Sequence, residues 1–391
     1  MRQCGSQQLK PGMILGRPIY DQHYRKLLSE GVKLDEASIR RIQESGFRYI
    51  FIQESGTEKI KVEELIGIQC RKEANEALEM VAEHDRAKDK SKSNPFATRR
   101  KAVSGFGARH KQLVQRALQS MMHDLMYARQ PVYFPGVYLA KDQLINHSTD
   151  VAILSMLIGI GFGLSSKDLM QLGKAALFHD VGKIRLDKEL SSIHPLDRTE
   201  EQQVMYSMHP QIGAVLMEQD ITTELHVTMA VLQHHELQDG SGFPEKLKGG
   251  GEQPMSVQRQ RGTIHRFAEI IAVSNYFDNL VSGQVERDPV TPFEAIRRIL
   301  DMTPQKFNPH IVQRAVSMIN VFPEGSNVEV ADSKHYKLVG FRGVVAKTNL
   351  ENLNKPVVTL LYDSRRKRLP KPLNVDFAKD DRVRLDYLYD L

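Results

Sequence analysis

Histidines and one aspartate are the residues of this 391-residue chain whose types and spacing favour metal chemistry. Asp180 directly follows His179, so an imidazole and a carboxylate can bind one ion while the carboxylate reaches a second. Histidine by itself is more often a core or surface residue, but several recur in a region with helical patterning. The full set of candidates is His147, His179, Asp180, His209, His234 and His235.

This candidate set divides into two groups. His147 would complete a first ion site with the pair at 179 and 180, whereas His209 and the tandem His234 and His235 could supply a second. Neutral imidazoles are ligands for iron, manganese and zinc alike, so residue type does not identify the metal. Cys4 and Cys70 are the only cysteines, which excludes a disulfide framework and a cysteine-rich zinc site.

Composition limits the partners only weakly. Hydrophobic residues make up 41% and charged residues 26%, as in soluble globular proteins. The net charge of +6 and the pI near 9.1 favour anionic ligands without separating nucleic acid, nucleotide and membrane surface.

The elements that must position these residues fall into several segments, because the chain is longer than one compact core usually accommodates. Residues 1–60 predict a small α+β module with a helix over 36–45 and a strand over 49–52. Residues 61–135 predict a helical connector, with helical spacing from residue 60 to about 92 and a further helix near 110–127. A flexible basic linker is expected at 86–101, and we interpret it as solvated chain rather than a phosphate-binding patch.

The remaining chain divides into two further segments. Residues 136–322 predict an all-helical domain, and residues 323–391 predict a small β-rich tail with alternating valines and turn residues. The expected fold class is therefore mainly α. The longest apolar stretch, 151–164, is shorter than the roughly 18 residues of a spanning helix and indicates a buried helix. The N-terminus has no apolar core of a signal peptide, so we expect a cytoplasmic protein without a membrane span.

Five ordered motifs carry a family resemblance: NHSTDVA, FHDVGKI, HPQIG, HHELQDGSGFP and IIAVSNYFDNL. Together they resemble the HD-GYP phosphodiesterases over nearly half of the chain. The resemblance implies an all-helical HD-type domain, two divalent metal ions, with iron or manganese favoured, and hydrolysis of cyclic di-GMP. It leaves open whether hydrolysis stops at the linear dinucleotide or continues to GMP.

The resemblance also assigns roles to residues of this chain. Lys183, near Asp180 on the helical face, matches a lysine that contacts phosphate, and we predict these two residues to be catalytic. GSGFP resembles the signature that gives the family its name, with phenylalanine in place of tyrosine. The predicted substrate-binding residues are Lys183, Gly242, Phe243, Pro244 and Arg287, and the predicted metal ligands are the six residues above together with Asn275.

Three further positions, at predicted metal or phosphate contacts, depart from the family pattern. Asn275 stands where the family has a metal-binding aspartate, while the later Asp278 is kept. An asparagine carbonyl can ligate a hard cation but brings no negative charge, so the first metal should be held less tightly. Gln284 replaces an arginine that contacts phosphate, although Arg287 retains a basic group. Gln143 replaces a glutamate of some members that hold a third ion, so we expect two metals at most.

Three functional hypotheses remain at this point. The first is a cyclic di-GMP phosphodiesterase, and the second is an impaired module that binds the dinucleotide or a protein without turnover, favoured by Asn275 and Gln284. The third is a hydrolase of another phosphate ester or cyclic dinucleotide, because fold and metals do not specify the base. No DNA or RNA partner is expected, and a homodimer is the hypothesis for assembly.

Overall fold

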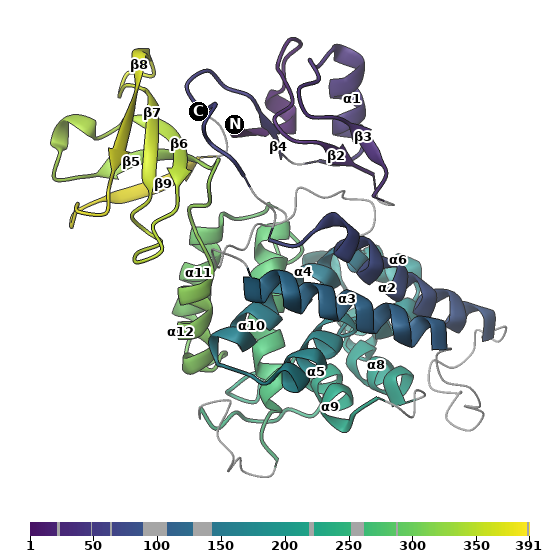
Figure 1. Cartoon of the computed structure of the whole chain (residues 1–391). Helices are drawn as coiled ribbons and strands as arrows, with labels where there is room; N and C mark the ends of the chain where they lie inside the picture. The colour runs from purple at the N-terminus through teal and green to yellow at the C-terminus, as the bar shows by residue number, and fades with distance from the viewer. Residues whose placement is uncertain are drawn as a thin grey trace.

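A computed structural model describes residues 1–21, 24–47, 49–62, 65–88, 108–127, 143–218, 223–251, 262–286, 288–388 and 391. These residues form a helical body with two smaller strand-containing parts, at the beginning and end of the chain, beside each other (Figure 1). The predicted fold class, mainly α with small N- and C-terminal parts, is confirmed.

The N-terminal part contains two short antiparallel sheets and one helix. Strand β1 (Arg2–Gly5) pairs with β4 (Tyr49–Ile52), and β2 (Ile19–Tyr20) pairs with β3 (Lys26–Leu28). Helix α1 (Glu36–Glu44) begins where the Asp35 side chain accepts a hydrogen bond from the Ser38 backbone N–H, an ordinary N-cap. Helix and strand lie close to the predicted ranges.

Two long helices lead from this part into the helical body. Helix α2 (Ile68–Lys88) packs against α3 (Ala108–Tyr127), and most of the predicted basic linker between them lies outside the described residues. The helical spacing predicted from residue 60 was wrong for its first turns, since α2 begins only at Ile68. Ile60 is instead buried against Val344 and Leu361 of the C-terminal sheet, which holds this segment away from a helical path.

The body consists of helices connected mostly by short segments. Their bounds are α4 (Gln143–Gly161), α5 (Ser166–Leu177), η2 (Val181–Arg185), α6 (Lys188–Ser192), η3 (Pro195–Asp197), α7 (Glu200–Tyr206), α8 (His209–Glu218), α9 (Leu225–Gln233), α10 (Arg266–Ser282), α11 (Pro292–Asp301) and α12 (Pro309–Met318). Helix α4 packs on α5, α10 and α12, and its apolar part is buried as expected. Helices α4, α5, α8, α9 and α10 share one continuous hydrophobic core.

The C-terminal part is a five-stranded antiparallel sheet in the order β8-β7-β6-β5-β9. Its strands are β5 (Asn327–Asp332), β6 (Arg342–Lys347), β7 (Val357–Tyr362), β8 (Arg368–Asp376) and β9 (Arg384–Leu388), and η4 (Tyr336–Leu338) lies between the first two. The sheet contacts the N-terminal part, because the Asn327 amide donates to the backbone oxygen of Gln3 at 3.0 Å. Among the helices described, none combines the length and the apolar character that crossing a membrane requires.

Candidate metal centre

Three helix ends and the first turns of α4 bring six of the seven predicted ligands together. His147 lies in α4, and the pair His179 and Asp180 follows α5. His209 begins α8. His234 caps the C-terminus of α9, and His235 is the next residue in the sequence. Two overlapping groups result, within each of which the ligand atoms lie within 4.8 Å of one another. The first holds His147, His179 and Asp180, and the second holds Asp180, His209, His234 and His235.

The glycine of the HDVGK motif allows this convergence. A Cβ on Gly182 would lie 2.0 Å from the backbone oxygen of His209 and 2.6 Å from the backbone nitrogen of Gly213. Any larger residue would therefore push η2 away from α8. The close contact of the two segments sets the Asp180 carboxylate beside the His209 ring.

Backbone and carboxylate acceptors orient the imidazole rings. The Nδ1 atoms of His179, His209 and His234 lie 2.7, 2.8 and 2.7 Å from the carbonyl oxygens of the residues three positions earlier. A carbonyl only accepts, so each Nδ1 carries the proton and each Nε2 keeps its lone pair. The Nδ1 of His147 lies 2.7 Å from Oδ2 of Asp278, the carboxylate–histidine arrangement that orients metal-ligating imidazoles.

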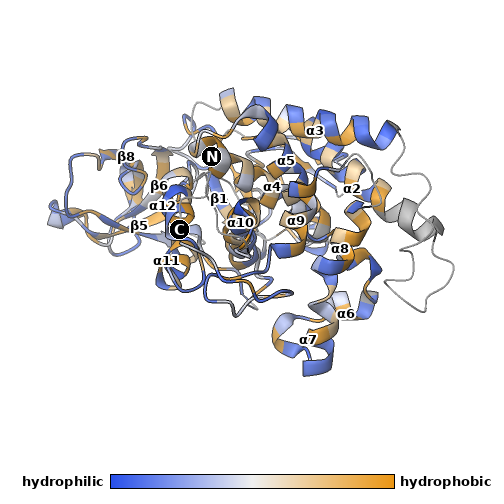
Figure 2. Cartoon of the chain, turned by 90° about the horizontal axis from the view of Figure 1, so that it is seen from below, coloured by the Kyte–Doolittle hydropathy of each residue, from blue (hydrophilic) through white to orange (hydrophobic). Residues whose placement is uncertain are grey.

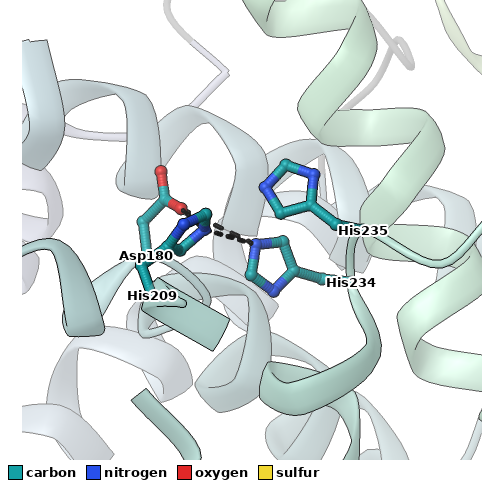
Figure 3. A group of neighbouring side chains, drawn as sticks. All are labelled: Asp180, His209, His234 and His235. Carbon is teal, nitrogen blue, oxygen red and sulfur yellow. Dashed lines mark hydrogen bonds and ion pairs between the residues drawn. The ribbon is translucent and has the colours of Figure 1, made fainter. Parts of the chain in front are cut away.

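The Asp180 carboxylate divides its two oxygens between the groups. Its Oδ2 lies 3.6 Å from Nε2 of His147 and 3.4 Å from Nε2 of His179, while Oδ1 lies 3.1 Å from Nε2 of His209 and 3.6 Å from Nε2 of His234. Figure 3 shows the carboxylate directed at the rings of the second group. Each oxygen of this one carboxylate thus faces a different set of imidazole nitrogens.

Burial keeps four of the imidazoles neutral. It lowers the pKa of His209 and of His234 to about 4 and lowers the pKa of His179 and His235 as well. Burial alone would raise the pKa of Asp180, but the positive charge of the Lys183 ammonium that pairs with it holds this pKa well below its usual range. At neutral pH these four imidazoles are therefore uncharged and lie beside one ionised carboxylate.

The donor set fits divalent metal ions. The Nε2 atoms of His209 and His234 lie 3.3 Å apart, and with both Nδ1 atoms protonated their two lone pairs face each other. The Nε2 atoms of His147, His179 and His235 are buried and make no hydrogen bond within the described chain. Buried nitrogen atoms of this kind cost free energy unless a proton or a cation binds them.

Four of the five predicted substrate-binding residues are described, and they lie beside the cluster. Lys183 forms an ion pair with Asp180, and its side chain is 14% exposed. The Phe243 ring stacks on His235 with ring centroids 4.5 Å apart, and a Cβ on Gly242 would lie 2.4 Å from the His235 backbone oxygen. The GSGFP segment, including the half-buried Pro244, therefore crosses directly over the second ligand group.

The three positions that depart from the family pattern at predicted metal or phosphate contacts lie in α10, directly after α10 and at the start of α4. Asn275 is buried in α10, and its side-chain oxygen accepts a hydrogen bond from the Asn279 amide at 2.7 Å. Gln284 follows the C-terminus of α10, where its backbone N–H donates to the oxygen of Asn279. Gln143 is the first residue of α4, and Arg287 lies outside the described residues.

Sequence reasoning missed a buried ion pair that supports the site. Arg71 of α2 donates to Asp150 of α4 at 2.8 Å, and the two side chains are 7% and 10% exposed. Asp150 lies three residues after His147, and Asp278 contributes to raising the pKa of Asp150, which burial lifts to about 6. A charged residue at the start of a strongly apolar stretch was the available signal.

A protein family and several known proteins are similar in sequence to this region of the chain. The HD domain family matches residues 137–311. A Pseudomonas aeruginosa protein named as a cyclic di-GMP phosphodiesterase is 26% identical over 227 residues, which cover 58% of this chain and 50% of that protein. The cyclic di-GMP phosphodiesterase response regulator RpfG of Xanthomonas campestris is 29% identical over 40% of this chain and 38% of its own length.

A third relative, a Thermotoga maritima protein named as a cyclic di-GMP phosphodiesterase, is 29% identical over 43% of this chain and 42% of its own length. The chain therefore spans half or less of each of these relatives. The matches agree with the resemblance that the ordered motifs indicated.

Proposed function

Since residues 137–311 belong to the HD domain family and are of the HD-GYP type, we propose that they form a metal-dependent phosphodiesterase that hydrolyses cyclic di-GMP. The observation that carries the proposal is the Asp180 carboxylate, whose two oxygens face two separate groups of imidazole nitrogens. A shared carboxylate between two such groups is suited to a pair of divalent ions. Paired ions are a recurrent arrangement for cleaving phosphodiesters.

The proposed ligands of the first ion are His147, His179 and Asp180, and those of the second are Asp180, His209, His234 and His235. When bound, two divalent ions supply an activated water and stabilise the charge that develops on the phosphate. Iron and manganese are the ions that we propose, because imidazole and carboxylate donors suit both.

The chain itself contributes orientation and charge. The carbonyl acceptors at Nδ1 hold each ring so that Nε2 points into the cluster. Lys183 is proposed to contact a non-bridging phosphate oxygen from the less buried side, and its charge persists because Asp180 and Tyr206 raise the pKa of Lys183 against the effect of burial. Phe243, stacked on His235, offers an apolar face to a base or sugar.

The proposed substrate is supported by the names of the relatives rather than by the geometry of the site. The three relatives described above are named for cyclic di-GMP, and the net charge of +6 suits an anionic ligand. We propose the linear dinucleotide as the first product, with GMP as the product of a second hydrolysis.

Asn275 supports a second candidate function, a module that binds cyclic di-GMP or a protein without turnover. Its amide oxygen already accepts from Asn279, and it brings no negative charge to the first group. In that case the phosphodiester would bind beside an incompletely filled first ion site.

Hydrolysis of cyclic di-GMP by the full chain, supplied with Mn²⁺ or Fe²⁺ under anaerobic conditions, tests the proposal. Asp180→Ala removes the shared carboxylate and should abolish turnover together with metal binding. Asp301→Ala is a matched control, since this aspartate is 62% exposed on α11 and pairs with Arg297. Metal content should be measured for all three proteins.

Turnover that survives in the control and is lost in Asp180→Ala would support the enzyme. Binding of cyclic di-GMP without turnover, with two ions present, would favour the second candidate. Turnover that persists in Asp180→Ala would refute the role of the shared carboxylate.

A further inference from the structure

A second cation lies beside the proposed site and has no role in the function described so far. The Arg198 guanidinium carbon lies 3.5 Å from the centroid of the Tyr206 ring, and the Lys183 ammonium lies 5.1 Å from the same centroid. The Tyr206 ring is in turn 5.0 Å from the ring of His209. Arg198 therefore belongs to a continuous set of side chains that ends at a proposed metal ligand.

The charges of the two cations are balanced differently. Lys183 is ion-paired with Asp180, whereas no described residue forms an ion pair with Arg198. The Nε of Arg198 is buried and lacks a hydrogen-bond partner within the described chain. A buried guanidinium N–H without an acceptor is costly, and two cations near one ring repel each other. Both effects would be relieved by an anion that binds Arg198.

Local structure fixes where Arg198 stands. It lies between η3 and α7, directly before Thr199, whose side chain accepts from the Gln202 backbone N–H while the Gln202 side chain accepts from Thr199 in return. Figure 2 shows α6 and α7 projecting from the body below α8, which carries His209. Arg198 therefore lies directly before the capped start of α7, on the segment that projects from the body.

The proposed substrate needs a cationic side chain of this kind for its second phosphate. A cyclic dinucleotide has two phosphodiesters, and when one lies at the metal ions the other remains charged and needs a separate partner. Gln284 stands where the family pattern has an arginine, and its neutral amide cannot neutralise a phosphate. Arginine is the side chain best suited to bind phosphate through two N–H groups.

We propose that Arg198 binds the second phosphate of the cyclic dinucleotide and so takes over the part of the missing arginine. The proposal rests on the proposed function of the metal centre. The contact with Tyr206 holds the guanidinium beside the proposed metal ligand His209. The competing view is a purely structural contact between Arg198 and Tyr206.

Arg198→Gln separates the two views when binding and turnover are measured with two ligands. Equilibrium binding of cyclic di-GMP is measured by calorimetry, and steady-state hydrolysis is measured for cyclic di-GMP and for bis(4-nitrophenyl) phosphate, which has one phosphate. Arg314→Gln is the matched control, because Arg314 of α12 stacks on Phe162 at 5.5 Å. Arg198→Lys tests whether charge alone suffices.

Loss of one charge-assisted contact should weaken cyclic di-GMP binding and raise its KM about 10- to 100-fold in Arg198→Gln. The KM for the single-phosphate diester should change by less than about threefold, and Arg314→Gln should behave as the unmodified chain. Arg198→Lys should recover part of the binding.

Three results would overturn the proposal. Unchanged cyclic di-GMP binding in Arg198→Gln would refute it while leaving the metal centre intact. An equal loss for both substrates would indicate a structural contact, and a chain that neither binds nor hydrolyses cyclic di-GMP would remove the proposed function itself.

Discussion

The buried ion pair between Arg71 and Asp150 allows a quantitative test of how α2 supports the metal centre. Both side chains are at most 10% exposed, and the bonded atoms lie 2.8 Å apart. The perturbation is Arg71→Met, which keeps much of the side-chain volume and removes the charge. It leaves the Asp150 carboxylate buried in α4 without that partner, one turn from His147.

The expected loss of folding free energy is about 3–5 kcal/mol at pH 8, as for other buried pairs from which one partner is removed. This loss should depend on pH. Burial raises the pKa of Asp150 to about 6 even with Arg71 present, and removing Arg71 raises it further. The unfolded carboxyl ionises near pH 4, so above that value the folded variant binds the extra proton and its stability falls as pH rises.

Urea unfolding of the metal-free chain at pH 5 and pH 8 measures both effects. At pH 5 the Asp150 carboxyl of the variant is neutral, and the loss should shrink to about 1–3 kcal/mol, the cost of an unsatisfied polar group. Arg297→Met is the matched control, because this arginine is 56% exposed in its pair with Glu294 and should cost less than about 1 kcal/mol.

The double variant Arg71→Met with Asp150→Leu completes the cycle. It removes both charges and should regain most of the lost stability, since an apolar pair can replace a buried ion pair without net cost. A loss below about 1 kcal/mol in Arg71→Met at pH 8, or a loss equal at both pH values, would refute this reasoning.

Three further predictions concern the ligands themselves. Asn275→Asp should raise metal affinity and turnover by adding a carboxylate at a predicted ligand position, which metal titration with activity assays would check; a variant that remains inert with metals bound would favour the binding module. Asp278→Asn should weaken metal binding about 10- to 100-fold, because it perturbs the partner of the His147 Nδ1, and titration with unchanged affinity would contradict this. The metal-free chain should lose stability as pH falls from about 6.5 to about 4, because the two histidines His209 and His234 bind protons in this range when unfolded but stay neutral when buried. Each histidine contributes on the order of 3 kcal/mol at most to this loss. An unchanged urea midpoint across this pH range would contradict the prediction.

Much of the fold could be predicted because local pattern and burial agree. The apolar run at 151–164 predicts a buried helix, and α4 is buried among α5, α10 and α12. The pattern failed before Ile68, where α2 begins, because Ile60 packs instead on the C-terminal sheet. Periodicity identifies apolar positions but does not specify which partner covers them.

The candidate site was predictable where ligands follow one another in short motifs. The HDVGK motif places His179 and Asp180 next to each other, so their proximity needed no tertiary information. Arg198 could not be identified in this way, because its relation to the site depends on the path of η3 and α7. Arg71 and Asp150 lie 79 positions apart in sequence, and only packing shows that they pair.

The balance of charge in the ligand set indicates where activity will be limited. Among the described histidines, cysteines, aspartates and glutamates, the two ligand groups contain six residues, of which Asp180 alone is anionic. Two divalent ions would therefore retain most of their positive charge, which lowers their affinity for the site and strengthens their attraction for a phosphodiester. Asn275 accentuates this imbalance because an amide replaces a carboxylate at a predicted ligand position. We therefore expect metal occupancy, rather than substrate binding, to limit turnover, and activity should rise with metal concentration well beyond the amount that an aspartate at this position would require.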